Sequence, residues 1–223
     1  MTTPLKIDFV SDVSCPWCAI GLKSLDEAIT RVGNDNITTE LHFQPFELNP
    51  KMVPEGQEIT EHITEKYGIS PAQAQANREN IRVRGEQVGF KFSMADEPGG
   101  GRSRIYNTFD AHRLLHWAEL VSPAKQKALK EALFKAYFTD GQSPGSHEVL
   151  VRVAGEVGLD VDKAREILAS DTYAAEVRER EQFYQRQGIH SVPAIIINDR
   201  HLISGGQPAE VFEQALRQIA AAG

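Results

Sequence analysis

The sequence has few cysteines, no long hydrophobic run and no excess of positive charge. Only two cysteines occur among its 223 residues, whereas a disulfide-stapled secreted fold uses more of them at wider spacing. The N-terminus lacks an apolar run long enough for a signal-peptide core, and no stretch approaches the length of a membrane span. We therefore expect a cytoplasmic protein that does not associate with membranes.

The charge balance excludes another class of partner. The formal net charge is -7 at pH 7, so the chain gains no electrostatic help from a phosphate backbone, and we expect no nucleic-acid binding. Hydrophobic residues make up 41% and charged residues 25%, which is ordinary for a globular protein. The length suits one large domain, or a domain that carries a sizeable insertion.

The N-terminal segment has the pattern of a β–α–β unit. Residues 5–10 predict a short strand, and residues 37–46 predict a second strand that ends at Pro45 and Pro50. Between them, apolar side chains at steps of three and four predict a helix with one buried stripe, made of Cys18, Leu22, Leu25, Ile29 and Val32. Such a unit opens a parallel sheet.

The middle of the chain, from about residue 59 to residue 187, contains helical patterns and no convincing strand. Ser70-Pro71 and Ser122-Pro123 each pair an N-cap residue with proline at the first helical position. The predicted helices span 59–66, 71–89, 104–119, 123–139, 147–157, 161–169 and 171–187.

The sheet resumes near the C-terminus. Residues 194–197 and 201–204 predict a β-hairpin, and residues 208–221 predict a final helix. The order β–α–β, helical block, β–β–α predicts an α/β fold, namely a thioredoxin fold with a large all-helical insertion. The predicted domains are a discontinuous thioredoxin-fold domain, 1–50 and 188–223, and an inserted helical domain, 51–187.

The two cysteines form the tetrapeptide Cys15-Pro16-Trp17-Cys18 where the first strand gives way to the helix. Residues three apart on a helix bring their Cβ atoms to about 5–6 Å, so a disulfide needs little movement to close. Unpaired N–H groups and the helix dipole favour a thiolate at Cys15. We expect Cys15 to be accessible with a lowered pKa, and Cys18 to be buried.

Other residues near the pair are candidates for substrate binding. Pro16 fits the first helical turn, and Trp17 offers a flat apolar platform beside the pair. Val192-Pro193 precedes the final hairpin, where thioredoxin folds place a cis-proline that faces the cysteines. The backbone of the residue before that proline can pair with an extended peptide.

Metal and proton-transfer roles have weaker support. A zinc site at the cysteine pair would need two distant ligands, and His112 and His116, four residues apart, lack a third, so we predict no metal site and no bound cofactor. Asp8 or Asp12 is a candidate for moving a proton at Cys18, although exposed carboxylates at a strand end are more common.

Five segments resemble the DsbA-like family, most closely its cytoplasmic FrnE-type branch, and the resemblance covers nearly the whole chain. They are Asp12-Val13-Ser14-Cys15-Pro16-Trp17-Cys18 with Ile20-Gly21, Phe46-Glu47-Leu48-Asn49-Pro50, Asn107-Thr108-Phe109-Asp110-Ala111-His112-Arg113, Gly188-Ile189-His190-Ser191-Val192-Pro193 and Ile203-Ser204-Gly205-Gly206-Gln207-Pro208. The resemblance implies a dithiol–disulfide oxidoreductase or disulfide isomerase that acts on protein or small-molecule thiols and disulfides.

The same resemblance leaves alternatives open. It implies that Asn107 and His112 lie on an insert helix that packs over the active site, where they line the groove or satisfy buried hydrogen bonds. A neighbouring branch holds glutathione-dependent 2-hydroxychromene-2-carboxylate isomerases and kappa-class glutathione transferases, which carry serine at the position of Cys15. We therefore expect thiol–disulfide exchange, with glutathione as a possible redox partner. A glutathione-dependent isomerase or transferase, or a peptide-binding, chaperone-like module, is the alternative.

Overall fold

The computed structural model describes residues 3–33, 37–93 and 103–222. The first part of the chain forms β1 (Thr3–Ser11), α1 (Pro16–Val32) and β2 (Ile37–Pro45), and the last part forms β5 (Ala194–Ile197), β6 (His201–Ser204) and α9 (Ala209–Ala222). Between them lie β3 (Gln57–Glu58), α2 (Ile59–Tyr67), α3 (Pro71–Gln87), β4 (Arg104–Ile105), α4 (Phe109–Val121), α5 (Pro123–Phe134), η2 (Lys135–Thr139), α6 (His147–Glu156), α7 (Val161–Leu168) and α8 (Ala174–Arg186).

The main sheet has four strands in the order β2-β1-β5-β6. β1 runs parallel to β2 and antiparallel to β5, and β5 and β6 form the predicted antiparallel hairpin. In this register Phe9 faces both Phe43 of β2 and Ile195 of β5. The parallel pair and the hairpin confirm the predicted thioredoxin-type order of strands.

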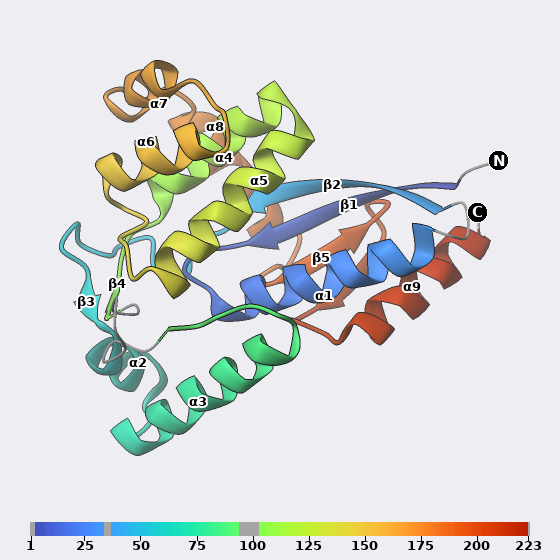
Figure 1. Cartoon of the computed structure of the whole chain (residues 1–223), viewed down its shortest axis with the longest axis horizontal. Helices are drawn as coiled ribbons and strands as arrows, with labels where there is room; N and C mark the ends of the chain where they lie inside the picture. The colour runs from blue at the N-terminus through green and yellow to red at the C-terminus, as the bar shows by residue number, and fades with distance from the viewer. Residues whose placement is uncertain (1–2, 34–36, 94–102, 223) are drawn as a thin grey trace.

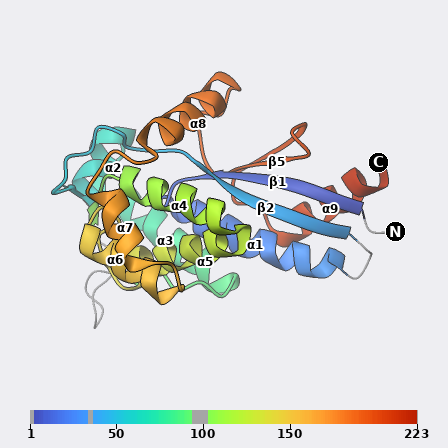
Figure 2. The same ribbon diagram turned by 90° about the horizontal axis from the view of Figure 1, so that it is seen from above.

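Helices cover both faces of this sheet. α1 and α9 lie side by side against one face, and α8 lies on the other (Figures 1 and 2). Alternate residues of β1 serve the two faces, because Phe9 packs among the side chains of α1 and α9 whereas Val10 packs with Tyr184 of α8. The sheet therefore supports α1 along one side.

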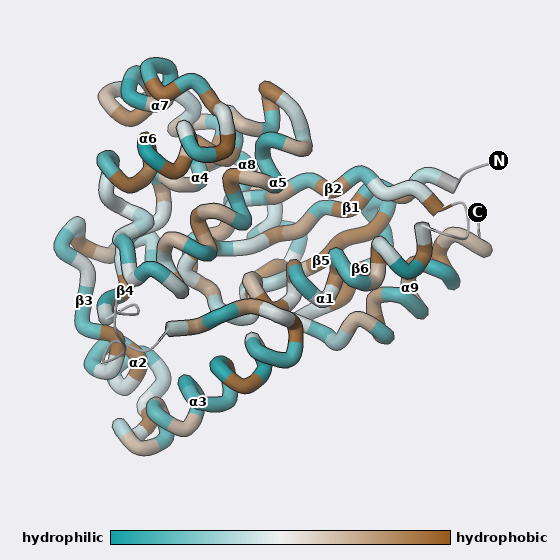
Figure 3. Tube along the Cα trace, viewed as in Figure 1, coloured by the Kyte–Doolittle hydropathy of each residue, from teal (hydrophilic) through white to brown (hydrophobic). Residues whose placement is uncertain are grey.

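The inserted helices form two parts. α2 and α3 form one part, and α4 to α7 form a second part on the opposite side of α1 (Figure 1). The second part has its own hydrophobic cluster, in which Leu114, Leu129 and Leu150 are completely buried. α3, by contrast, is mostly hydrophilic along its length (Figure 3) and buries only Ala74 and Gly85.

The structure corrects three details of the expected insert. The insert is not all-helical, because β3 and β4 pair as a two-stranded antiparallel ribbon. α4 begins at Phe109 instead of residue 104, since Asn107 accepts a hydrogen bond from the Phe109 N–H at 2.9 Å and fixes the helix start there. The helix expected over 123–139 changes after Phe134 into the π-helical turn η2. No helix in the described part of the chain combines the length and apolar character needed to cross a membrane.

Candidate active site

The cysteine pair lies at the start of α1. Cys15 is the N-cap residue, with extended backbone, and Pro16 occupies the first helical turn, where its missing N–H costs nothing. No side chain caps this end of the helix, and the Cys18 and Trp17 N–H groups lie close enough to the Cys15 sulfur to lower its pKa. Both cysteines are free thiols. The sequence correctly predicted this position for the pair.

Cys15 is more enclosed than the sequence suggested. The expectation that it is accessible is wrong for the side chain as a whole, because only 4% of its surface is exposed. The loop before β5 covers it: the Cys15 thiol lies 3.6 Å from the carbonyl oxygen of Val192 and donates a hydrogen bond to it. The Val192–Pro193 peptide bond is cis, as predicted. Cys18 is completely buried, which was also predicted.

The two thiols differ in acidity. A hydrogen bond from the Cys18 thiol holds the pKa of Cys15 below its usual value, and the Cys18 and Trp17 N–H groups add to the effect against burial and the Asp12 charge. Burial raises the pKa of Cys18 well above its usual value, and the neighbouring Cys15 raises it further. Cys15 is therefore the thiol that ionises first, and Cys18 keeps its proton.

Two glycines allow the hairpin to pack against α1 beside the pair. A Cβ atom on Gly206 would lie 2.8 Å from the Trp17 carbonyl oxygen, too close for any side chain. A Cβ on Gly21 would lie 3.2 Å from both Gly206 Cα and the Pro193 ring. The loop that carries Val192 and Pro193 is held over Cys15 by this close contact.

A cavity of about 820 Å³ opens beside Cys15. One wall comes from the start of α1 and the loop before β5, with Cys15, Pro16, Trp17 and Val192. The opposite wall is the inner side of α2 and α3, and the segment after β2 completes the lining. Cys15 is thus reached through this cavity, and four basic side chains also line it: His62, Lys66, Arg78 and His190.

Lys66 is the cation most closely tied to the active-site segment. Its Nζ donates hydrogen bonds to the Leu48 carbonyl oxygen at 2.8 Å and to Asn49 Oδ1 at 2.7 Å. Burial lowers the pKa of Lys66, and the negative charges of Asp12 and the Cys15 thiolate oppose that shift. The ammonium group of Lys66 therefore senses the charge of the Cys15 sulfur.

Asp12 organises the loop between β1 and α1. Its carboxylate accepts hydrogen bonds from the Ser14 N–H at 3.0 Å and the Leu48 N–H at 2.7 Å. His112 Nε2 lies 3.7 Å from Asp12 Oδ1, which is within ion-pair range but longer than a hydrogen bond. Burial would raise the pKa of Asp12, but His112 and the two N–H groups outweigh it and lower the pKa.

Asp8 lies apart from the cysteines. It accepts a hydrogen bond from Gln44 Nε2 at 2.6 Å and pairs with Lys6 at 2.9 Å. Burial raises the pKa of Tyr184 of α8, and the nearby Asp8 carboxylate raises it further, so Asp8 lies on the α8 face of the sheet. Of the two candidate carboxylates, only Asp12 lies on the active-site loop.

The structure separates the predicted substrate-binding residues into two groups. Pro16, Trp17 and Val192 line the cavity, and Pro193 is buried directly behind Val192. Asn107 and His112 do not line it. Asn107 instead accepts a hydrogen bond from the Phe109 N–H at the start of α4 and donates one to Glu47 Oε2 at 3.3 Å, and His112 lies beside Asp12.

Lys66 and Glu47, which line the cavity, were not singled out from the sequence. Glu47 lies in the Phe46-Glu47-Leu48-Asn49-Pro50 segment, which is one of the five segments that resemble the DsbA-like family. That resemblance was the signal in the sequence that could have identified Glu47. Within the described residues, no group of three or more His, Cys, Asp and Glu side chains could hold a metal ion. His116 packs against the Tyr173 ring, with centroids 5.1 Å apart.

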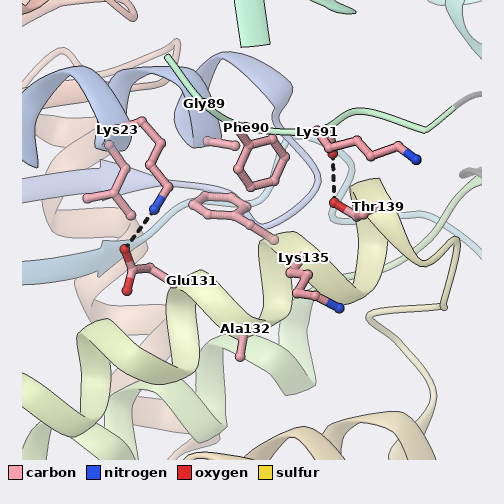
Figure 4. Close-up of a pocket in the computed structure, with 11 residues that line it drawn as sticks. Lys23, Gly89, Phe90, Lys91, Glu131, Ala132, Lys135 and Thr139 are labelled. Atoms are coloured by element: carbon pink, nitrogen blue, oxygen red, sulfur yellow. Dashed lines mark hydrogen bonds and ion pairs between the residues drawn. The ribbon is translucent and has the colours of Figure 1, made fainter. Parts of the chain in front are cut away.

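A second cavity, of about 410 Å³, lies between α1, α5 and residues 89–91, and neither cysteine lines it (Figure 4). Lys23 of α1 and Glu131 of α5 form an ion pair across it, with 3.3 Å between Lys23 Nζ and Glu131 Oε1. This ion pair joins α5 to α1.

Comparison with known proteins agrees with this architecture. The chain is similar to the probable DsbA oxidoreductase SCO1869 from Streptomyces coelicolor, with 33% identity and a TM-score of 0.86 over 98% of this chain and 90% of that one. Two more distant structures share the fold. A 2-hydroxychromene-2-carboxylate isomerase has 14% identity and a TM-score of 0.73 over 97% of each chain. The cytosolic disulfide reductase DsbM from Pseudomonas aeruginosa, in a structure with glutathione, has 16% identity and a TM-score of 0.64 over 97% of this chain and 99% of that one.

A family model gives the same assignment over most of the sequence. The model of the DSBA-like thioredoxin domain matches residues 6–217, which include the cysteine pair, the whole helical insert, the cis-proline loop and the hairpin. The match agrees with the strand order, the position of the cysteines at the start of α1 and the cis bond at Val192–Pro193. The chain belongs to the DSBA-like thioredoxin domain family.

Proposed function

We propose that the protein catalyses thiol–disulfide exchange, with Cys15 as the attacking thiolate and Cys18 as the resolving thiol. The observation that carries this proposal is the opposite shift of the two pKa values at one helix end, together with the cavity that reaches only Cys15 of the pair. Attack on a disulfide requires a thiolate that a substrate can reach. The lowered pKa of Cys15 and its place in the cavity lining support this role. No bound cofactor is needed.

The reaction cycle balances with the two cysteines and one substrate disulfide. The Cys15 thiolate attacks one substrate sulfur, forms a mixed disulfide and releases the other sulfur as a thiolate. Cys18 then loses its proton and attacks the Cys15 sulfur, which forms the Cys15–Cys18 disulfide and releases the second substrate thiolate. The substrate gains two electrons, and the pair loses two. The reverse sequence oxidises a substrate dithiol.

The cavity supports a small or extended anionic substrate, such as glutathione in disulfide linkage or a peptide that carries a disulfide. Its volume of about 820 Å³ suits a ligand of that size, and Lys66 and Arg78 offer positive charge to carboxylates. DsbM, which shares the fold, has been solved with glutathione. A cytoplasmic location, which we propose from the sequence, would expose the pair to the glutathione pool.

Trapping of mixed disulfides tests the two roles. Cys18→Ser deletes the resolving thiol, so substrates should accumulate as mixed disulfides on Cys15 after free thiols are alkylated. Cys15→Ser is the matched control, since it makes the same chemical change and should trap almost nothing. Equal trapping by the two variants would contradict the assignment.

The fold shared with the chromene-carboxylate isomerase, together with the cavity beside Cys15, supports a second candidate, a glutathione-dependent isomerase or transferase. Turnover of a chromene carboxylate or an electrophile with glutathione, with no trapping by either variant, would favour it. Peptide binding that persists after loss of both cysteines would instead favour a chaperone-like module.

A further inference from the structure

The insert carries a buried lysine that the sequence did not single out. Lys130 of α5 is completely buried, and its Nζ has no hydrogen-bond partner within the residues that the structure describes. Its Nζ also lies over the Phe134 ring, 5.1 Å from the ring centroid. Burying an ammonium group without a hydrogen-bond partner is costly unless nearby negative charge compensates for it.

The packing of α5 aims this lysine at the start of α1. Lys23 and Asp26 of α1 pair with Glu131 and Lys127 of α5, the second pair at 2.9 Å (Figure 4 shows the first). On the other side, Gln126 exchanges two hydrogen bonds of 2.9 Å with the backbone of Phe43 in β2. Lys130 therefore points into the space between α1 and the sheet, which is where Cys18 is buried.

The charged groups around Lys130 are few. The strongest electrostatic partner of its Nζ is Cys18, followed by Asp12 and then Cys15. The neighbouring charges on α1 and α5, which are Lys23, Asp26, Lys127 and Glu131, form one ion-pair network among themselves. Burial lowers the pKa of Lys130 to about 8, so its neutral and charged forms are both accessible near neutral pH.

Neither carboxylate competes for the proton of Cys18. Both oxygens of Asp12 accept backbone N–H groups, and its lowered pKa makes it a poor proton acceptor. Asp8 serves the α8 side of the sheet through Gln44 and Tyr184. Cys18 has a raised pKa and must nevertheless lose its proton before it can attack Cys15. Among the described residues that act on the pKa of Cys18, Lys130 is the ionisable side chain left besides Cys15 itself.

We propose that Lys130 controls the protonation of Cys18, as proton acceptor when Cys18 attacks and as proton donor when the pair is reduced. The inference rests on the proposed thiol–disulfide exchange. In the resolving step, neutral Lys130 takes the Cys18 proton, the Cys18 sulfur bonds to Cys15, and the Cys15–substrate bond breaks. The substrate leaves as a thiolate, and the Lys130 ammonium then returns its proton to solvent.

Ellman's reagent separates the two chemical steps in the reduced protein. Attack by Cys15 releases one thionitrobenzoate and leaves a mixed disulfide, and resolution by Cys18 releases the second. In Lys130→Met the first release should stay within about twofold of wild type. The second should slow by at least about tenfold at pH 7, and its pH profile should move upward.

Lys125→Met is the matched control, because it makes the same change on the same helix where Nζ binds the Val157 carbonyl oxygen at 2.6 Å. Both releases should be unchanged in it. Lys130→Gln, which also cannot ionise, provides a second variant and should behave like Lys130→Met. Urea unfolding of each variant shows that the folded protein is compared.

Failure of this inference is distinguishable from failure of the proposed function. A single release in the wild-type protein would mean that Cys18 does not resolve, which refutes the exchange mechanism. Two releases in wild type, with a second release of normal rate and pH profile in both Lys130 variants, would overturn the role of Lys130. An equal slowing in Lys125→Met would overturn it as well.

Discussion

The two parts of the helical insert meet α1 on different sides, and they differ in how they are built. The α4–α7 part has a continuous hydrophobic cluster and brings α5 against α1, next to Cys18. The α2–α3 part buries only Ile59, Ala74 and Gly85 and lines the cavity that reaches Cys15. One part is therefore suited to fixing the geometry around the buried thiol, whereas the other is suited to contacting substrate.

This difference predicts unequal costs for truncating side chains in the two parts. Leu129→Ala removes a completely buried side chain from the α4–α7 cluster and should lower the free energy of unfolding by about 2–5 kcal/mol. Ile63→Ala in α2 removes a half-buried side chain at the cavity wall and should cost only about 1 kcal/mol. Urea unfolding of both variants measures the contrast, and equal losses would refute it.

A second prediction concerns Asp12, which links α4 to the active-site loop. Asp12→Asn places an amide NH₂ against a backbone N–H of Ser14 or Leu48, so one charge-assisted hydrogen bond is lost. The loss should cost about 1.5–3 kcal/mol of unfolding free energy at pH 7. Urea unfolding at pH 7 gives the value, and Asp162→Asn on α7, where the side chain is exposed, is the control.

The cost of Asp12→Asn should depend on pH. Because folding lowers the pKa of Asp12, its carboxylate stabilises the folded state fully above its unfolded pKa of about 4, and the contribution is lost as the pH falls through the lower, folded value. The gap between wild type and Asp12→Asn should therefore narrow as the pH falls below about 4. A gap of constant size down to pH 3 would mean that the carboxylate charge is not the stabilising feature.

The sequence predicted the elements of both parts well where local signals decide them. Ser70 and Gln73 form the capping box that starts α3, and Ser122 caps α5 as expected. The sequence did not reveal β3 and β4, because each has two residues and they pair across a sequence separation of more than forty. The π-helical turn η2 was also missed, since the pattern of Lys135–Thr139 continues that of α5.

The burial of Cys18 was predicted from the sequence and that of Cys15 was not, because only the burial of Cys18 depends on local sequence. Cys18 continues the apolar stripe of α1, so its burial follows from the helix alone. The burial of Cys15 depends on Val192, which is 177 residues away in the chain. Lys130 was missed, although it shares the buried stripe of α5 with Gln126, Leu129, Leu133 and Phe134. The helical periodicity alone places Lys130 on this buried stripe, so the sequence did contain a signal for a buried lysine.

A third prediction tests the influence of the buried thiol on the cavity-facing one. Cys18→Ala removes the hydrogen-bond donor that contributes most to the lowered pKa of Cys15, so that pKa should rise. Cys18→Ser keeps a hydroxyl donor and should raise it less. Thiolate absorbance near 240 nm, titrated in both variants, gives the order. A Cys15 pKa in both variants equal to that of wild type would show that the helix N-terminus, rather than Cys18, sets the acidity.

The smallest expected effect lies in the α2–α3 part, at Lys66. Lys66→Gln removes a positive charge from the cavity wall near Cys15, so the KM for glutathione disulfide should rise about 1.4- to fivefold, as for an exposed ion pair worth about 0.2–1 kcal/mol. The effect should shrink at high salt, because exposed charges are screened. Lys163→Gln, at an exposed position of α7, should leave KM unchanged.

Hydroxyethyl disulfide provides the neutral comparison for Lys66→Gln. It carries no carboxylate, so its KM should be the same in wild type and in the variant, while its kcat reports whether the Cys15 thiolate itself has changed. A rise in KM for both disulfides would assign Lys66 to holding the Leu48–Asn49 segment through its two hydrogen bonds. A rise for glutathione disulfide alone would show that the α2–α3 part selects substrate by charge.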